Sequence, residues 1–416
     1  MRILFLLHDW LPEHVGGTEV HTLELARELA RLGHEPTILC TERDQARADG
    51  DLLRREHQGI PVIEVAHARE YACAEEMWGE PRQAAVFRRI LRTVRPDVLH
   101  VEHFAAWGTG VLALAREAGV PAFVTLHDFH LLCARGTLLR DDGSLCAGDC
   151  SQCLESLPSP RAGAGPGPWA AAAEARREQH REDLRSASAV ISPSRFLARL
   201  MEQRGMVREG SVHVLDSGLV GEWREPRVSD PRTPLRVGYV GGLYPSKGVH
   251  VLVEALARLA PGLATLDVHG VLEWFPDYVA RLRNSAAGRV EVQWHGRFAP
   301  EQLDRILDGL DLLVLPSLWP ENRPLTLQAA FRRGVAVLAA DLGGMRELCD
   351  AGRYGRLFPR GDPAALAREI EGLARDRARL FEAACARPRL ASIGEVAQAH
   401  LALYGAARTS LPSESP

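Results

Sequence analysis

The sequence predicts an α/β protein with two doubly wound parallel sheets, and three observations lead to this class. The chain has 416 residues, which is long for one hydrophobic core and suggests two domains. Short β-branched runs alternate with helix-like segments along most of the chain, a pattern typical of parallel sheets. The alternation falls into two series of about six strands each, so we expect two separate sheets.

The first series begins at the N-terminus, where a helix expected at 18–32 follows the first strand and is closed by Gly33. The second series begins at Leu235. The expected strands are 2–7, 36–41, 61–66, 97–102, 121–126 and 189–194 in the first series, and 235–240, 264–269, 290–295, 312–317, 335–340 and 354–359 in the second.

These series place the first domain at residues 1–220 and the second at residues 234–390. The connecting segment 221–234 is polar, rich in proline and without period. A C-terminal helix at 391–407 is expected to complete the first domain, and the polar tail 408–416 is predicted to be disordered.

Composition and charge narrow the class of protein. Hydrophobic residues make up 46% and charged residues 25% of the chain, as in ordinary soluble domains. A net charge of −4 argues against a nucleic-acid partner, because such binders usually carry a basic face. The apolar run 3–7 is too short for a signal peptide, and no run approaches the roughly 20 apolar residues of a membrane span. We expect a cytoplasmic protein and leave open a peripheral contact with the inner face of the membrane.

One glycine pair follows the first strand of each series. Gly16 and Gly17 let a ligand approach the backbone closely before the next helix begins, although their spacing alone slightly favours a plain tight turn with Thr18 as N-cap. Gly241 and Gly242 repeat the arrangement, and Lys247 stands where the following helix starts. A lysine there opposes the helix dipole unless an anion is bound, which makes Lys247 a candidate for a phosphate contact, although a solvated side chain explains it equally well.

A single carboxylate follows the strand in "LLVLPSLWPENRPLTLQAAFRRG". Glu321 precedes a helix expected at 324–333, with Pro324 at its first position and Gly334 after its end. There the carboxylate can accept hydrogen bonds from hydroxyl groups, or it can simply complement the helix dipole. The later segment "ADLGGMRE" repeats the strand, glycine and helix pattern at Gly343 and Gly344.

Together these motifs resemble the retaining glycosyltransferases of family 4. The resemblance runs from Met1 to about Tyr404, with the motifs in the family's order. They are "GGTEVHTLELARELARLGHEPTIL", "VTLHDFHLLC", "GYVGGLYPSKGVHVLVEAL", "VEVQWHGRF", "LDLLVLPSLWPENRPLTLQAAFRRGVAVLAADLGGMREL" and "YGRLFPRGDPAALA". The family implies the GT-B fold, in which two Rossmann-like domains face each other across a cleft.

The resemblance also implies an activity, namely sugar transfer from a nucleotide-sugar to a cell-surface glycan, a lipid-linked sugar or a metabolite. His127 and Glu321 would act on the transferred sugar, and retention would proceed by front-face substitution without a catalytic metal. Lys247 would neutralise the diphosphate. The donor-binding residues would be Gly16, Gly17, Gly242, Lys247, Asn322, Pro324 and Leu325.

Two positions depart from the family pattern. Ala329 stands where the family has a second glutamate that binds the ribose, with Gln328 beside it, and Gly242 stands where the family often has arginine. A lost charge-assisted hydrogen bond costs roughly 1.5–3 kcal/mol. These departures motivate an alternative, a catalytically weak or silent GT-B protein that acts as a partner of an active glycosyltransferase.

Four cysteines crowd into the insertion at about 133–153. Their spacing is C-x12-C-x3-C-x2-C, and four thiolates can close a tetrahedral structural zinc site. We expect such a zinc, while an iron–sulfur cluster, a redox disulfide or unligated thiols remain alternatives. A metal-dependent redox protein would explain only this segment. The cysteines are Cys133, Cys146, Cys150 and Cys153.

Overall fold

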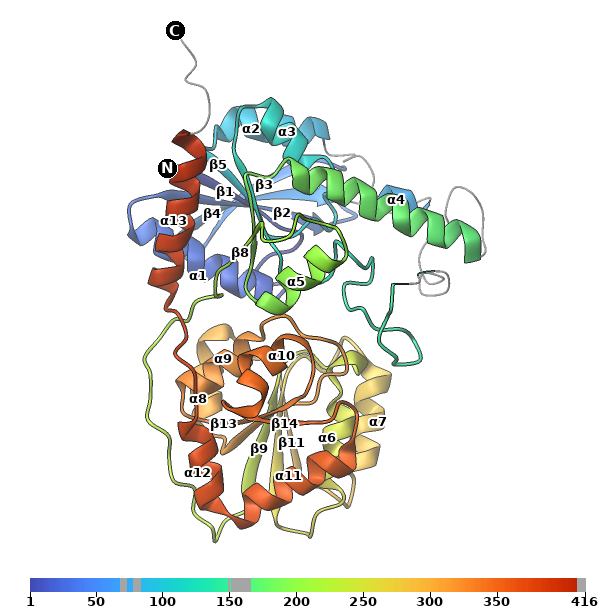
Figure 1. Ribbon diagram of the computed structural model, residues 1–416, viewed down its shortest axis with the longest axis vertical. Helices are drawn as coiled ribbons and strands as arrows, with labels where there is room; N and C mark the ends of the chain where they lie inside the picture. Colours follow the sequence, from blue (N-terminus) through green and yellow to red (C-terminus); the bar gives the residue numbers. More distant parts are fainter. Residues whose placement is uncertain (68–72, 78–83, 149, 151–165, 410–416) are drawn as a thin grey trace. The chain divides into compact units, whose positions relative to one another are not determined.

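The computed structural model describes the chain apart from residues 68–72, 78–83, 149, 151–165 and 410–416. The chain divides into two compact units. Unit 1 comprises Met1–Asp141, Cys146–Gly218 and the segment from Ala391 onward, and unit 2 comprises Asp142–Leu145 and Leu219–Leu390. Helices flank the sheet of each unit (Figure 1).

Unit 1 is built on an eight-stranded sheet with the order β3-β4-β2-β1-β5-β6-β7-β8. All neighbouring strands are parallel except β3 and β4. The strands are β1 Arg2–Leu6, β2 Glu35–Arg43, β3 Leu52–His57, β4 Ile60–His67, β5 Val98–Val101, β6 Ala122–Thr125, β7 Ala189–Ser192 and β8 Val212–Val214. The helices are α1 Gly17–Arg31, α2 Ala84–Val94, α3 Val111–Glu117, α4 Pro166–Arg185, α5 Arg195–Gln203 and α13 Ile393–Thr409, with a 3-10 turn η1 Ala74–Met77.

Unit 2 is built on a six-stranded sheet with the order β11-β10-β9-β12-β13-β14, parallel throughout. Its strands are β9 Leu235–Val240, β10 Ala264–His269, β11 Val292–Gly296, β12 Leu312–Leu315, β13 Ala336–Ala340 and β14 Arg356–Phe358. Its helices are α6 Val249–Leu256, α7 Pro276–Ala286, α8 Leu303–Asp308, α9 Leu325–Arg332, α10 Gly343–Leu348, α11 Pro363–Arg375 and α12 Arg377–Cys385, with 3-10 turns η2 Pro245–Lys247, η3 Pro300–Gln302 and η4 Asp350–Gly352.

Every strand expected from the sequence is present, and two more occur at the edges of unit 1. The central strands β12 and β13 are apolar and buried at every position, because helices cover both faces of a parallel sheet. The unexpected strand β3 pairs antiparallel with β4 through a tight turn in which Gln58 and Gly59 have φ values of 49° and 83°. Its charged, half-exposed residues hide the alternation that marks a strand.

Helix α13 packs on α1 and contributes to the core of unit 1. Its Tyr404 is fully buried, and the Tyr404 hydroxyl is hydrogen-bonded to Nδ1 of His100 on β5. The helix extends to Thr409, so residues 408 and 409, expected in a disordered tail, are helical. The rest of that tail, 410–416, lies outside the described residues.

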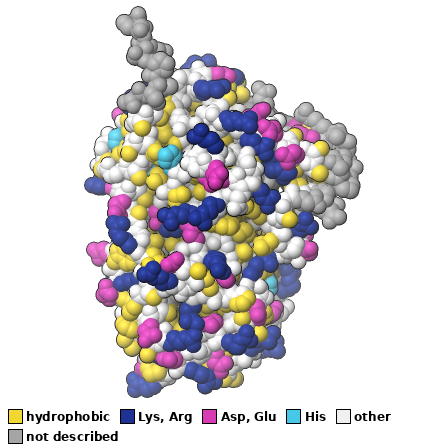
Figure 2. Space-filling view, in the orientation of Figure 1, with side chains coloured by type: hydrophobic (Ala, Val, Ile, Leu, Met, Phe, Trp, Pro, Cys, Tyr) yellow, Lys and Arg dark blue, Asp and Glu magenta, His cyan; other side chains and the backbone are white. Residues whose placement is uncertain are grey.

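The surface is mixed in charge. Basic and acidic side chains are interspersed on the face shown in Figure 2. Within the described ranges, each helix is either too short or too polar to cross a bilayer.

Candidate active site

The carboxyl ends of β9 and β12, neighbours in the unit 2 sheet, bring together the two predicted charges of this unit. Lys247 lies on η2 after β9, and Glu321 follows β12. Their Nζ and Oε1 atoms are 2.7 Å apart, and the Lys247 ammonium lies 4.9 Å from the centre of the Trp319 ring. Lys247 therefore has a carboxylate partner even without an anionic ligand.

The described donors to the Glu321 side chain converge on one carboxylate oxygen. Besides Lys247, Oε1 accepts hydrogen bonds from Oγ of Ser317 at 2.6 Å and from Nε1 of Trp319 at 3.1 Å. Glu321 is 7% exposed, and no described residue donates to its second oxygen, Oε2. The carboxylate is thus oriented by three donors and keeps one oxygen for other hydroxyl groups.

Glycines allow the backbone segments that carry these side chains to approach each other. Gly248 has φ +69°, and a Cβ there would lie 2.0 Å from the carbonyl oxygen of Pro316. The amide of Leu318 donates to the carbonyl of Ser246 at 2.8 Å, which joins the loop after β9 to the loop after β12. These contacts fix the distance between Lys247 and Glu321.

The glycine pair Gly343 and Gly344, which follows β13, supports the Glu321 loop. The amide of Gly344, at the start of α10, donates to the carbonyl of Glu321 at 2.7 Å. A Cβ on Gly344 would lie 1.5 Å from the carbonyl oxygen of Asn322. Gly343, with φ +56°, packs against Pro320. In this structure both glycines make room for the Glu321 loop.

Helix α9 begins at Leu325, with Pro324 as its N-cap residue. The expectation that Pro324 is the first helical residue is therefore wrong by one position, because its ψ of 120° is not helical. Asn322 is buried at 4% exposure in the turn before the helix. Gln328 is fully buried, and its Nε2 donates to the carbonyl of Arg323 at 3.4 Å, while its Oε1 has no hydrogen-bond partner among the described residues. Ala329 is 3% exposed.

Gly242 faces an aromatic ring. A Cβ at this position would lie 2.3 Å from Cε2 of Tyr244, whose ring stacks on Trp274 with 5.6 Å between centroids. The carbonyl of Gly242 accepts a hydrogen bond from the Tyr239 hydroxyl at 2.6 Å. The volume that a family arginine would enter at this position is therefore taken by Tyr244.

In unit 1, Gly16 is the N-cap of α1 and Gly17 its first residue. A Cβ on Gly16 would lie 2.5 Å from the carboxylate oxygen Oε2 of Glu19, a buried residue in the first turn. Burial raises the pKa of Glu19 to about 7. Its acidic side chain thus lies at the turn where the family resemblance implied that Gly16 and Gly17 contact the donor.

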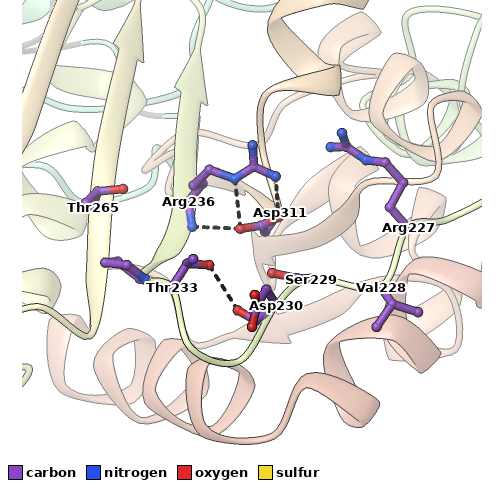
Figure 3. Close-up of a pocket in the computed structure, with 9 residues that line it drawn as sticks. Arg227, Val228, Ser229, Asp230, Thr233, Arg236, Thr265 and Asp311 are labelled. Carbon is purple, nitrogen blue, oxygen red and sulfur yellow. Dashed lines mark hydrogen bonds and ion pairs between the residues drawn. The ribbon is translucent and has the colours of Figure 1, made fainter.

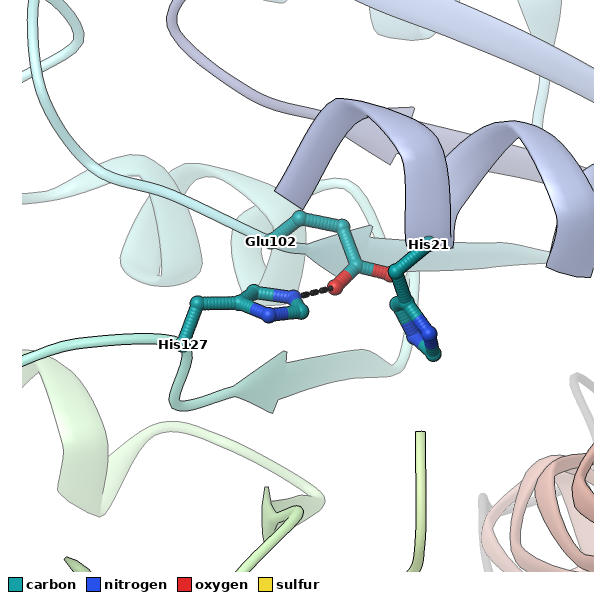
Figure 4. Close-up of side chains that lie close together, drawn as sticks. All are labelled: His21, Glu102 and His127. Atoms are coloured by element: carbon teal, nitrogen blue, oxygen red, sulfur yellow. Dashed lines mark hydrogen bonds and ion pairs between the residues drawn. The ribbon is translucent and has the colours of Figure 1, made fainter. Parts of the chain in front are cut away.

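His127 follows β6 and meets two residues that the sequence did not single out (Figure 4). Its Nε2 lies 2.6 Å from Oε2 of Glu102, which follows β5, and its ring lies 5.2 Å from that of His21 on α1. Burial lowers the pKa of His127 to about 4, so the imidazole is neutral at pH 7. Glu102 ends the predicted strand 97–102, a position where a carboxylate in this fold class faces ligands. The position of Glu102 at the end of a predicted strand was therefore a signal in the sequence that could have identified this residue.

Of the four cysteines, Cys133, Cys146 and Cys150 are described and Cys153 lies outside the described residues. The described three do not form a group whose ligand atoms all lie within 4.8 Å. Burial raises the pKa of the Cys150 thiol, although the Arg177 guanidinium lies 3.4 Å from its sulfur. The four-cysteine zinc site stays a prediction.

An open pocket of about 390 Å³ lies at the amino ends of the unit 2 strands, where β9 and β10 begin (Figure 3). Two of its charged groups form an ion pair, since Arg236 contacts Asp311 at 2.7 Å. The backbone amide of Arg236 also donates to Asp311 at 3.0 Å. This pocket is distant in the fold from Lys247 and Glu321, which stand at the carboxyl ends of the strands.

Comparison with known proteins identifies the family of this chain. The family described as "Glycosyl transferase 4-like domain" matches residues 16–218, and "Glycosyl transferases group 1" matches residues 234–376. The chain is a GT-B glycosyltransferase of the family 4 type. This glycosyltransferase is 25% identical to a glycogen synthase of Mycobacterium tuberculosis in an alignment 422 residues long, which covers 94% of this chain and 91% of the relative. It is 27% identical to a GDP-mannose-dependent alpha-mannosyltransferase of Mycolicibacterium smegmatis over 366 residues, with 86% and 84% covered.

Solved structures confirm the expected GT-B fold. Anabaena Alr3699/HepE in complex with UDP and glucose superposes with a TM-score of 0.67 at 19% identity, covering 98% of this chain and 100% of the other. Sucrose-phosphate synthase from Thermosynechococcus elongatus superposes with a TM-score of 0.70 at 17% identity, covering 99% and 100%.

Proposed function

We propose that this glycosyltransferase transfers a sugar, with retention of configuration, from a nucleotide-sugar to a glycan, lipid-linked or metabolite acceptor. The observation that carries the proposal is the Lys247–Glu321 pair at the carboxyl ends of β9 and β12. Ligands of doubly wound sheets bind at these ends. A diphosphate would attract Lys247, and the second oxygen of Glu321 would accept hydroxyl groups of the sugar.

The relatives support a nucleotide-sugar donor. HepE was crystallised with UDP-glucose, and the mycobacterial mannosyltransferase depends on GDP-mannose. Both names describe those proteins and leave the base and sugar of this chain's donor to experiment. Asn322, Pro324 and Leu325 are proposed to contact the donor from the turn before α9.

In unit 1 we propose His127 as the second group that acts on the transferred sugar. A neutral imidazole can contact the reacting sugar without adding positive charge near an oxocarbenium-like transition state. The hydrogen bond from Nε2 to Glu102 fixes the orientation of the ring.

The test is turnover with a panel of nucleotide-sugars, followed by NMR of the anomeric proton of the product. Wild type is expected to release nucleotide from one donor class and to give a product with the donor's anomeric configuration. Glu321→Gln and His127→Ala should each lower turnover by about 100-fold or more. Glu371→Gln is the matched control, since Glu371 pairs with Arg375 on the exposed face of α11.

Inversion of the anomeric centre would refute retention. Failure of every donor to bind or turn over would instead favour the alternative of a silent GT-B partner, which Ala329 and Gly242 suggest.

A further inference from the structure

Three side chains of unit 1 bring metal-ligand atoms together on the buried side of His127 (Figure 4). They are His21 on α1, Glu102 after β5 and His127 after β6. One nitrogen from each imidazole and one carboxylate oxygen all lie within 4.8 Å of one another. Because the three residues come from separate elements, the folded sheet and not a local turn assembles the group.

His21 has one ring nitrogen whose lone pair is unused. Its Nδ1 lies 2.8 Å from the carbonyl oxygen of Ser217. A carbonyl only accepts hydrogen bonds, so Nδ1 carries the proton and Nε2 of the neutral ring is an acceptor. His21 is 6% exposed, and its Nε2 has no hydrogen-bond partner among the described residues. Metal-binding histidines typically donate their other N–H to a backbone carbonyl in this way.

Glu102 adds a carboxylate that lacks a strong cationic partner. It is 1% exposed, and its Oε1 atom has no hydrogen-bond partner in the described part of the chain. Its ion-pair contacts within the described ranges are with histidines, His127 at 2.6 Å and His100 at 3.7 Å. Nε2 of His100 is already hydrogen-bonded to Thr125 at 2.7 Å. An unused lone pair and an unpartnered carboxylate oxygen therefore belong to one close group of buried residues, and burying such atoms without a donor or a cation is costly.

We propose that His21, Glu102 and His127 form a binding site for a first-row transition-metal dication of the zinc class. The ligands are Nε2 of each histidine and the carboxylate of Glu102. Tetrahedral bonds of about 2.0–2.2 Å separate ligand atoms by roughly 3.3–3.6 Å. This value lies between the 2.6 Å contact of His127 with Glu102 and the 4.8 Å limit of the group, so side-chain shifts of about 1 Å suffice.

The orientation of the rings also fits. The His21 and His127 planes are inclined by 59°, so their in-plane lone pairs can point to one ion. The unit 2 group Asp267, His269 and His295 has equally close atoms, but its imidazoles stack with 2° between planes at 4.1 Å. Lone pairs in parallel planes do not converge, so this second group serves as a control.

The site goes beyond the proposed function and can be tested without any sugar donor. A metal on Nε2 would leave the ring proton of His127 on Nδ1. Metal binding would thereby change which nitrogen of the proposed catalytic histidine donates a hydrogen bond.

The experiment is titration of the metal-free full chain with Zn²⁺ and Co²⁺, with metal analysis after dialysis, visible spectroscopy and X-ray absorption. Variants are His21→Gln and Glu102→Gln. His180→Gln is the matched control, since His180 is buried at 1% exposure with neither ring nitrogen hydrogen-bonded to the described residues. His269→Gln controls for the stacked group.

The wild-type protein is expected to retain about one equivalent of metal per chain, and its X-ray absorption spectrum should show imidazole and oxygen ligands. His21→Gln should weaken binding by more than the roughly 10- to 100-fold typical of an outer-shell change, while both controls bind as wild type does. The wild-type spectrum decides the ligand type even if a variant fails to fold. No retained metal, retention by His21→Gln, or the charge-transfer bands of thiolate ligands from the cysteine segment would overturn the proposal.

Discussion

Gly344 is expected to be indispensable to the position of Glu321, and Gly344→Ala tests this. The amide of Gly344 donates to the carbonyl of Glu321 at 2.7 Å, and an added Cβ would lie 1.5 Å from the Asn322 carbonyl oxygen. An ordinary carbon–oxygen contact is more than 3 Å, and the atom in conflict is backbone, which no side-chain rotation can move away. The loop between residues 320 and 322 must therefore shift outward by about 1.5–2 Å.

The magnitude follows from two contributions. Overpacking of a close contact costs about 1–3 kcal/mol. Loss of the buried backbone hydrogen bond adds about 0.5–1.5 kcal/mol. The free energy of unfolding should therefore fall by about 2–4 kcal/mol. A displacement of this size at a positioning group typically lowers turnover by about 100-fold.

Urea unfolding and donor turnover measure the two effects. Gly372→Ala is the control, because Gly372 lies within α11 and its nearest neighbour is the flexible end of Arg379 at 3.2 Å. That control should be neutral or stabilised by up to about 1 kcal/mol. If Gly344→Ala has a free energy of unfolding within about 0.5 kcal/mol of wild type and full turnover, the close packing described for this loop is wrong.

Three further predictions concern single sites. Lys247→Met should lower the free energy of unfolding by about 1.5–3 kcal/mol, because it leaves Glu321 without its cationic partner. The double variant with Glu321→Gln should recover most of the lost stability. A double-mutant cycle that shows no coupling energy would contradict the ion pair. Burial raises the pKa of Asp183 to about 6, so the folded state holds a proton that the unfolded state releases above about pH 4. Stability should thus fall with rising pH across pH 4–6 by up to about 3 kcal/mol, and urea unfolding of Asp183→Asn should lack this loss. Ala329→Glu should bind nucleotide-sugar about 10-fold or more tightly by calorimetry if the missing ribose contact limits affinity, and unchanged affinity would show that it does not.

Much of the fold follows from local sequence patterns. The buried parallel strands stand out because both faces are apolar, as in the run that became β12 and β13. Strand β3 was missed because Arg54, Arg55 and Glu56 occupy a half-exposed edge, where packing does not demand apolar residues.

The residues of the candidate site were likewise only partly predictable from local sequence patterns. Lys247 and Glu321 could be found because each follows a strand next to glycine or proline. Their direct contact depends on the pairing of β9 with β12, which are more than 70 residues apart in sequence and brought together only by the sheet order. His21 and Glu102 escaped notice because a histidine within a helix and a glutamate at a strand end have ordinary local contexts. Only the tertiary fold shows that they meet His127.

Equilibrium binding of a nucleoside diphosphate and of its nucleotide-sugar tests the central claim most directly. Calorimetry would compare wild type, Lys247→Met and Glu321→Gln. Lys247→Met should weaken both ligands by about 10- to 150-fold, since the diphosphate is common to them. Glu321→Gln should remove the extra affinity that the sugar confers while diphosphate binding is retained. If both variants bind both ligands as wild type does, the donor site is not built on Lys247 and Glu321.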